Sequence, residues 1–263
     1  MDIYRLHQGE AALIVSMPHV GTHLPAPIAD TMTPIARHVV DTDWHVERLY
    51  DMAAAMGATT IAATHARYVV DLNRPPDNKP LYAGADNTEL VPLTTFDHEP
   101  IYLPGQEPDT AEIARRVETY WRPYHERLAA EIERLRASHE RIVLWEGHSI
   151  RSHVARFFEG RLTDFNLGTG SGISCDGDLA ARIEAEAAAN NTFTSVMNGR
   201  FKGGYITRHF GQPAKGVHAI QLELSQITYM EETLPFRYLP ETAEPTKALI
   251  TRLLSVAQDW AKG

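Results

Sequence analysis

Short apolar runs alternate with helical patterns along the 263-residue chain, and this alternation is the feature that most restricts its fold. Apolar runs rich in β-branched residues predict buried strands at residues 11–17, 59–63, 141–146, 193–197 and 217–224. Apolar residues at helical spacing predict helices at 43–56, 109–137, 177–190 and 244–261, with Pro123 as a kink in the second. Strands that alternate with helices are typical of an α/β protein, here a three-layer sandwich around a mostly parallel mixed sheet.

The part of the chain after residue 67 is expected to form an extended run followed by a long loop. Residues 68–72 are apolar, and the two prolines after Asn73 and Arg74 exclude a helix there. The segment from there to Asp109 is rich in Pro, Gly, Asp and Asn, which is typical of lids and binding segments. No repeat, low-complexity tract or linker divides the sequence, so we expect one domain, residues 1–263.

Composition and charge exclude several classes of protein. No apolar run approaches the ~20 residues that a bilayer span needs. The formal charge of −9 disfavours nucleic acid and anionic membranes as partners, because both are polyanions. The single cysteine, Cys175, excludes an internal disulfide and a thiolate zinc site, so a metal here needs His and carboxylate ligands. The N-terminus lacks the pattern of a signal peptide, and the expected location is the cytoplasm.

Histidines follow two of the predicted strands. His19 comes after LIVSMP and His148 after IVLWEG, and the carboxyl ends of parallel strands meet at one rim of a sheet. Two histidines and one carboxylate form a catalytic zinc set with the fourth position left for water. The carboxylate is predicted to be Asp43, which begins a helix whose packing would hold it; Asp41 stays an alternative, because an extended DTD segment would put both side chains on one side. We therefore predict one divalent metal ion, Zn²⁺.

Glu223 lies inside the apolar run AIQLEL. A carboxylate in such a strand costs several kcal/mol unless it is paired, hydrogen-bonded or associated with a metal. The same ligand types also serve 2-His-1-carboxylate iron oxygenases, but that function leaves Glu223 and the segment Asp71-Leu72-Asn73-Arg74 without a task. His125, in RPYHER on the long predicted helix, either reaches the site or stays at the surface.

Eight segments together resemble the N-formylglutamate amidohydrolases, also called N-formylglutamate deformylases. In chain order they are SMPHVGTHLP, DTDWHVERLYD, HARYVVDLNRP, RPYHERL, LWEGHSIRS, NLGTGSGISC, NGRFKGGYITRHFGQP and AIQLELSQITYM, and they cover nearly the whole chain. The resemblance implies a zinc-exopeptidase-like fold, related to zinc carboxypeptidases and aspartoacylases. It also implies metal-dependent hydrolysis of N-formyl-L-glutamate to L-glutamate and formate, the last step of a histidine degradation route.

Residue by residue, the resemblance implies His19 and His148 as ligands, residues 71–74 as the DxNR segment and Glu223 as the catalytic glutamate. Zinc carboxypeptidases carry HxxE at the first ligand, whereas the residue three after His19 is Thr22. This departure moves the carboxylate ligand to the DTD segment. Glu223 is then expected to act as general base and afterwards as general acid.

The substrate implied by the resemblance is a small dianion. Arg67, Arg74 and Arg208 lie in the resembling segments, and their planar guanidinium groups suit carboxylates; Lys202 is a further candidate. Asn73 or Arg74 is expected to polarise the formyl oxygen. The close alternative is a related metal-dependent amidohydrolase that removes another acyl group from an acidic amino acid, and the size of the acyl pocket distinguishes the two.

Overall fold

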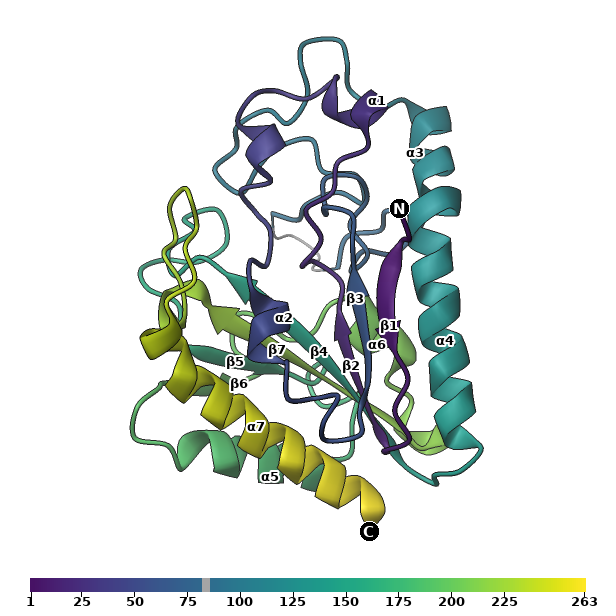
Figure 1. The fold of residues 1–263 in the computed structure, drawn as a ribbon, viewed down its shortest axis with the longest axis vertical. Helices are drawn as coiled ribbons and strands as arrows, with labels where there is room; N and C mark the ends of the chain where they lie inside the picture. Colours follow the sequence, from purple (N-terminus) through teal and green to yellow (C-terminus); the bar gives the residue numbers. More distant parts are fainter. Residues whose placement is uncertain (82–85) are drawn as a thin grey trace.

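The computed structural model describes residues 1–81 and 86–263, and its strands form one seven-stranded sheet (Figure 1). The strand order is β1-β3-β2-β4-β7-β5-β6, and only the β1–β3 and β5–β7 pairs are antiparallel. The predicted mixed, mostly parallel sheet is therefore confirmed. The strands are β1 (Tyr4–His7), β2 (Leu13–Met17), β3 (Thr59–Ala63), β4 (Ile142–Ile150), β5 (Phe165–Gly168), β6 (Ser195–Met197) and β7 (Val217–Ser225).

Helices cover both faces of the sheet (Figure 1). The α-helices are α1 (Ala26–Ala29), α2 (Val46–Leu49), α3 (Thr110–Arg116), α4 (Arg122–Arg136), α5 (Gly177–Ala188), α6 (Tyr205–Phe210) and α7 (Pro240–Lys262). The shorter turns are η1 (Ala36–His38), η3 (Pro213–Lys215) and η4 (Gln226–Thr228), and η2 (Val117–Trp121) is π-helical. On one face α2 and α7 pack against β4; on the other lie α4 and α6. None of the described helices is long and apolar enough to cross a bilayer.

The two central strands β4 and β7 are buried along their whole length. They pair in parallel with His148 opposite Glu223 and Glu146 opposite Gln221. Alternate side chains of a strand point to opposite faces, so these four polar residues share one face of the sheet. That face is the one covered by α6, because Thr207 of α6 donates its backbone N–H to Glu146. The pairing of β4 with β7 therefore places a histidine beside a carboxylate in the middle of the molecule.

Two predicted elements are wrong. The helix expected at 43–56 is reduced to Val46–Leu49, because His45 has a left-handed backbone (φ 63°) and the chain continues as turns to Gly57. Asp43 does not cap this helix, since its carboxylate contacts His148. Residues 68–72 form no strand: residues 68, 69 and 72 lie in turns, and residues 70 and 71 have no regular secondary structure. The short elements β1, β5 and α6 were not predicted, because four to six residues are too few to show a period.

The long helix expected at 109–137 is confirmed as α3, η2 and α4 in succession. It begins at Asp109, whose side chain accepts a hydrogen bond from the Glu112 N–H at 2.8 Å. Pro123 has no N–H to donate to the preceding turn, and the π-helical turn lies directly before it. The expected kink at Pro123 thus takes the form of a wider turn, which shifts the helix register.

Candidate functional site

His19, Asp43 and His148 meet beyond the carboxyl end of β2. Each of them offers one ligand atom, and these atoms lie within 4.8 Å of one another. The Asp43 Oδ2 atom lies 2.9 Å from His148 Nδ1 and 3.8 Å from His19 Nδ1. All three side chains are buried. The structure therefore brings together the three residues that the sequence predicts as metal ligands.

The other nitrogen of each histidine ring faces a buried carboxylate. His19 Nε2 lies 2.7 Å from Asp71 Oδ1, and His148 Nε2 lies 2.7 Å from Glu146 Oε1. A carboxylate in this position fixes the orientation and tautomer of a metal-binding histidine. Both rings thus have Nδ1 toward Asp43, which leaves this nitrogen of each ring to serve as a metal ligand.

The charges around this cluster also fit a cation. Asp43, Asp71 and Glu146 are all buried, whereas the nearest guanidinium, Arg67, pairs with Asp71 at 2.7 Å and lies 3.9 Å from Asp43. Burial and the positive charge of Arg67 lower the pKa of His19 below its ordinary value, whereas Glu146 and Asp43 raise the pKa of His148 above it despite burial. A metal ion at this site would bind the neutral form of both rings. The buried negative charge exceeds what Arg67 can neutralise, so a divalent cation fits the site.

Asp41 does not join the cluster. Its Oδ2 atom accepts hydrogen bonds from the Tyr68 hydroxyl at 2.6 Å and from the Phe96 N–H at 2.9 Å. The segment is not extended, so the two carboxylates of DTD find different partners. The geometry favours Asp43 over Asp41 as the third ligand.

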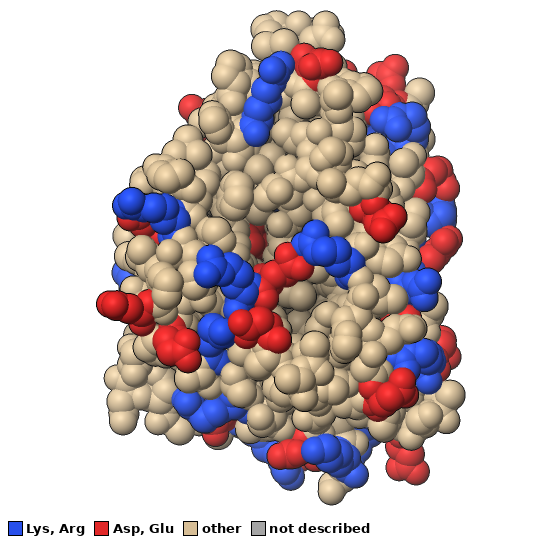
Figure 2. Space-filling model, viewed as in Figure 1, with Lys and Arg blue, Asp and Glu red and all other residues tan. Residues whose placement is uncertain are grey.

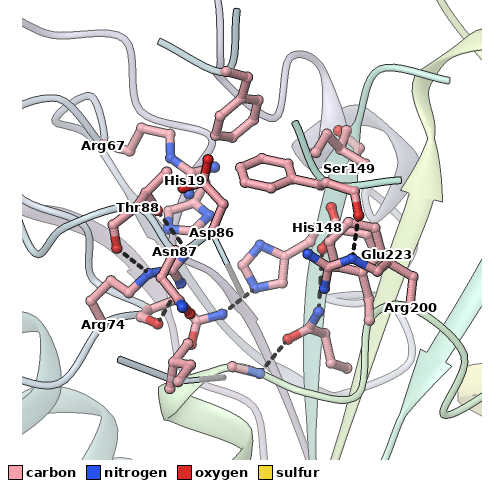
Figure 3. A pocket seen from close by; sticks show the side chains of 18 residues that line it. His19, Arg67, Arg74, Asp86, Asn87, Thr88, His148, Ser149, Arg200 and Glu223 are labelled. Atoms are coloured by element: carbon pink, nitrogen blue, oxygen red, sulfur yellow. Dashed lines mark hydrogen bonds between the residues drawn. The ribbon is translucent and has the colours of Figure 1, made fainter. Parts of the chain in front are cut away.

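Glu223 lines the same pocket as His19 and His148 (Figure 3). Its register opposite His148 places it beside the candidate ligands, and Gln221 Nε2 donates to its Oε2 atom at 3.2 Å. Burial raises the pKa of Glu223 to about 8. A carboxyl group with a pKa near neutrality, in a pocket, is suited to accepting and returning a proton.

Three arginines line the pocket: Arg67, Arg74 and Arg200. Arg74 donates to the Thr88 hydroxyl at 2.8 Å and to the Thr88 carbonyl at 3.1 Å. The guanidinium of Arg208, which was expected here, instead donates to the Gly203 carbonyl at 2.8 Å, and neither Arg208 nor Lys202 is among the described residues that line the pocket. Arg200 is not among the residues predicted from the sequence, although it lies in the resembling segment NGRFKGGY, two residues before Lys202.

Aromatic side chains form much of the apolar part of the pocket wall, together with Leu81 and Ile150. Phe96, Phe157 and Phe201 line it, and the Arg200 guanidinium lies over the Phe201 and Phe157 rings at 5.4 and 5.9 Å. Contacts of this kind attract a guanidinium to the faces of aromatic rings. Figure 2 shows the molecule from the same side as Figure 1, with Lys, Arg, Asp and Glu side chains around a hollow near the middle of the face in view.

Asn73 lies between the site and α6. Its Nδ2 atom is 3.1 Å from His148 Nε2, and its Oδ1 atom accepts a hydrogen bond from the Ile206 N–H at 2.9 Å. The Asn73 N–H in turn donates to Asp71 Oδ1 at 2.8 Å. Within the DLNR segment, Asp71 thus contacts one histidine of the cluster and Asn73 the other.

Comparisons with known proteins find similarity over most of this chain. The family model described as N-formylglutamate amidohydrolase matches residues 11–230. A Pseudomonas aeruginosa protein named N-formylglutamate deformylase is 50% identical over 99% of this chain and 98% of its own length. A Pseudomonas putida protein of the same name is 49% identical over 98% of this chain and 96% of its own length.

Solved structures show the same similarity. The crystal structure of N-formylglutamate amidohydrolase from Ralstonia eutropha superposes with a TM-score of 0.85, at 25% identity, over 100% of this chain and 99% of that chain. A gene product from Agrobacterium tumefaciens shares the fold at 17% identity, with a TM-score of 0.77 over 100% of this chain and 97% of its own. The match of the family model and the full-length similarity at about half identity show that the chain belongs to the N-formylglutamate amidohydrolase family.

Proposed function

We propose that this protein hydrolyses N-formyl-L-glutamate to L-glutamate and formate with the help of one divalent metal ion, Zn²⁺. The observation that carries the proposal is the His19–Asp43–His148 cluster, which borders a pocket that also contains Glu223 and three arginines. The names of the relatives at about half identity support the same substrate.

The residues of the site fit two roles in amide hydrolysis: three of them would bind the metal ion, and Glu223 transfers a proton. His19, Asp43 and His148 would hold a divalent metal ion, which would supply Lewis acidity toward a water molecule and the formyl carbonyl. Glu223 accepts a proton from the attacking water while the oxygen of that water molecule bonds to the formyl carbon. Glu223 then passes this proton to the glutamate nitrogen as the C–N bond breaks, which releases formate and L-glutamate.

The arginines fit the charges of the substrate. Arg67 lies 3.9 Å from Asp43, so its positive charge is at the end of the pocket where the formyl oxygen becomes negative in the transition state. Arg74 and Arg200 line other parts of the wall, and we assign them to the two substrate carboxylates. The Asn73 side chain lies 3.1 Å from the His148 ring, and we assign it to the formyl end of the pocket. The resemblance also supports a place at the end of histidine degradation.

Three substrates and a chelator test the proposal. We expect the metal-loaded protein to release formate from N-formylglutamate and to be much slower with N-acetylglutamate and N-succinylglutamate. Chelation should abolish turnover, and added Zn²⁺ should restore it. Faster turnover of the acetyl or succinyl substrate would support the alternative amidohydrolase. Undiminished turnover by protein shown to be metal-free would overturn the metal-dependent mechanism.

A further inference from the structure

The long helix made of α3, η2 and α4 carries three buried hydrogen-bond donors that all reach backbone carbonyls of one short segment. Arg116 Nη1 donates to the Val69 carbonyl at 3.3 Å, His125 Nε2 to the Leu72 carbonyl at 2.8 Å, and Trp121 Nε1 to the Arg74 carbonyl at 3.0 Å. Carbonyl oxygens only accept, so the direction of each bond is certain. One side of this helix is therefore bound to the backbone of residues 69–74.

The π-helical turn keeps these donors on one side of the helix. Arg116 and Trp121 are five residues apart, which matches the wider spacing of a π turn, and Trp121 and His125 are four apart. The rings of Trp121 and His125 stack at 3.7 Å with an angle of 20° between their planes. In an uninterrupted α-helix, residue 120 would occupy the place of Trp121.

The segment that receives these bonds carries three side chains of the candidate site. Asp71 contacts His19, Asn73 contacts His148, and Arg74 lines the pocket. The segment forms turns, so no β-ladder holds its backbone. The Asp71 N–H donates to the Leu90 carbonyl at 2.7 Å, and the Asn73 carbonyl accepts from the Tyr205 N–H at 3.3 Å. The helix side chains that bind the Leu72 and Arg74 carbonyls hold the remaining part of this segment.

We propose that Trp121 and His125 are positioning residues that hold the backbone of residues 71–74, and that the π turn sets their register. This decides between the alternatives for His125: it is buried, and its Nε2 atom binds the carbonyl of Leu72, which lies between Asp71 and Asn73 in the chain. The inference rests on the proposed function only for the substrate used to measure turnover.

The test compares Trp121→Phe and His125→Phe with Tyr124→Phe. The first two keep an aromatic ring and remove one donor to the segment; the His125 Nδ1 atom has no partner among the described residues, so His125→Phe removes no second bond. Tyr124→Phe removes a buried hydroxyl of the same helix that contacts Ser16 at 3.0 Å, away from residues 71–74. It is the matched control.

We expect Trp121→Phe to act mainly on KM, through Arg74, and His125→Phe mainly on kcat, through Asp71 and Asn73. Each should lower kcat/KM for N-formylglutamate about tenfold, the effect of one lost buried hydrogen bond, whereas Tyr124→Phe should change it less than about twofold. Amide hydrogen exchange of residues 69–76 should accelerate in the first two variants and stay at the wild-type rate in the control.

Equal losses of kcat/KM in all three variants, or unchanged exchange of residues 69–76 in Trp121→Phe and His125→Phe, would overturn the positioning role. Absence of formate release by the wild type would instead overturn the proposed function. The exchange measurement needs no turnover, so it decides the positioning role in that case as well.

Discussion

The buried carboxylates of this protein differ in what surrounds them, and their expected roles differ accordingly. Asp71 and Glu146 face histidine rings, whereas Glu223 faces the pocket and contacts the side chain of Gln221. A carboxylate that contacts a histidine ring fixes the orientation of that ring, and one that faces the pocket can transfer a proton to or from the substrate. Single substitutions separate these roles.

Glu223→Gln is expected to leave the fold and the metal content intact and to lower kcat by about 10²–10⁴-fold, because the amide cannot accept the proton of water. KM should change little. Steady-state kinetics together with elemental analysis check this. More than about a tenth of wild-type kcat at normal metal content would remove Glu223 from the mechanism.

The two aspartates of the DTD segment should differ in their effect on metal binding. Asp43→Asn is expected to lose most of the bound metal, because the Asp43 oxygen lies between the two histidines. Asp41→Asn should keep it, because Asp41 contacts Tyr68 and Phe96. Metal content per chain, measured on both purified variants, decides between them. Loss of metal in Asp41→Asn alone would reverse the assignment.

Arg200 and Arg208 form a second matched pair, since only Arg200 lines the pocket. Arg200→Ala is expected to cost ~2–4 kcal/mol of transition-state binding, or roughly 30- to 1,000-fold in kcat/KM, with N-formylglutamate. The loss should be much smaller with a neutral N-formyl amino acid. Arg208→Ala should affect both substrates alike and less. A larger, substrate-dependent loss in Arg208→Ala would favour the original expectation from the sequence.

At the scale of elements, the start of α6 is bound to the site by four backbone N–H groups, of which that of Tyr205 donates to the Asn73 carbonyl at 3.3 Å. Those of Gly204, Ile206 and Thr207 donate to Gln221 at 2.8 Å, Asn73 at 2.9 Å and Glu146 at 3.1 Å. These donors are the ones that a helix start leaves without partners inside the helix. The first N–H groups of α6 therefore find hydrogen-bond acceptors in Asn73 and in polar residues of β4 and β7, and these buried acceptors find donors in α6.

Gly204→Ala tests this contact. A Cβ atom at this position would lie 2.2 Å from Asn73 Nδ2, so either Asn73 or α6 must move. We expect a loss of ~1–3 kcal/mol in the free energy of unfolding and at least about a tenfold loss in kcat/KM. Gly177→Ala is the control, because nothing lies within 4 Å of its Cβ position and it begins α5. Denaturant unfolding and kinetics of both variants check the prediction; similar behaviour of the two would contradict it.

At the scale of the whole molecule, the buried His125 makes stability depend on pH. Burial lowers its pKa to about 3, whereas the unfolded chain has a value of ~6.5. The unfolded chain therefore binds this proton more tightly, and stability falls as the pH decreases from about 6.5 toward 3. When the pH decreases from 7 to 5, His125 lowers the free energy of unfolding by roughly 2 kcal/mol.

His125→Phe should remove this contribution, so that its unfolding free energy decreases less steeply between pH 7 and pH 5 than that of the wild type. Denaturant unfolding of both proteins at several pH values checks it, because every other titrating group is common to the two. Parallel curves would show that His125 does not titrate in this way.

Several features of this protein follow from the sequence alone, because their causes are local. Apolar β-branched runs predict β2, β3, β4 and β7, since burial of a strand depends on the residues within it. His19, His148 and Glu223 lie at the ends of these strands or within them, and such positions indicate the site because ligands bind at the carboxyl ends of the strands in a parallel sheet. The order of motifs indicates the family, which the comparisons confirm.

Only the tertiary structure decided which side chains of distant segments meet. Asp41 and Asp43 are equivalent by spacing, and the packing of Tyr68 and Phe96 against Asp41 separates them. Arg200 lines the pocket and Arg208 does not, although both lie in one segment. The wider turn before Pro123 shifts the helix register by a residue. In each case the direction of a side chain depends on contacts between segments far apart in the chain, which no local pattern contains.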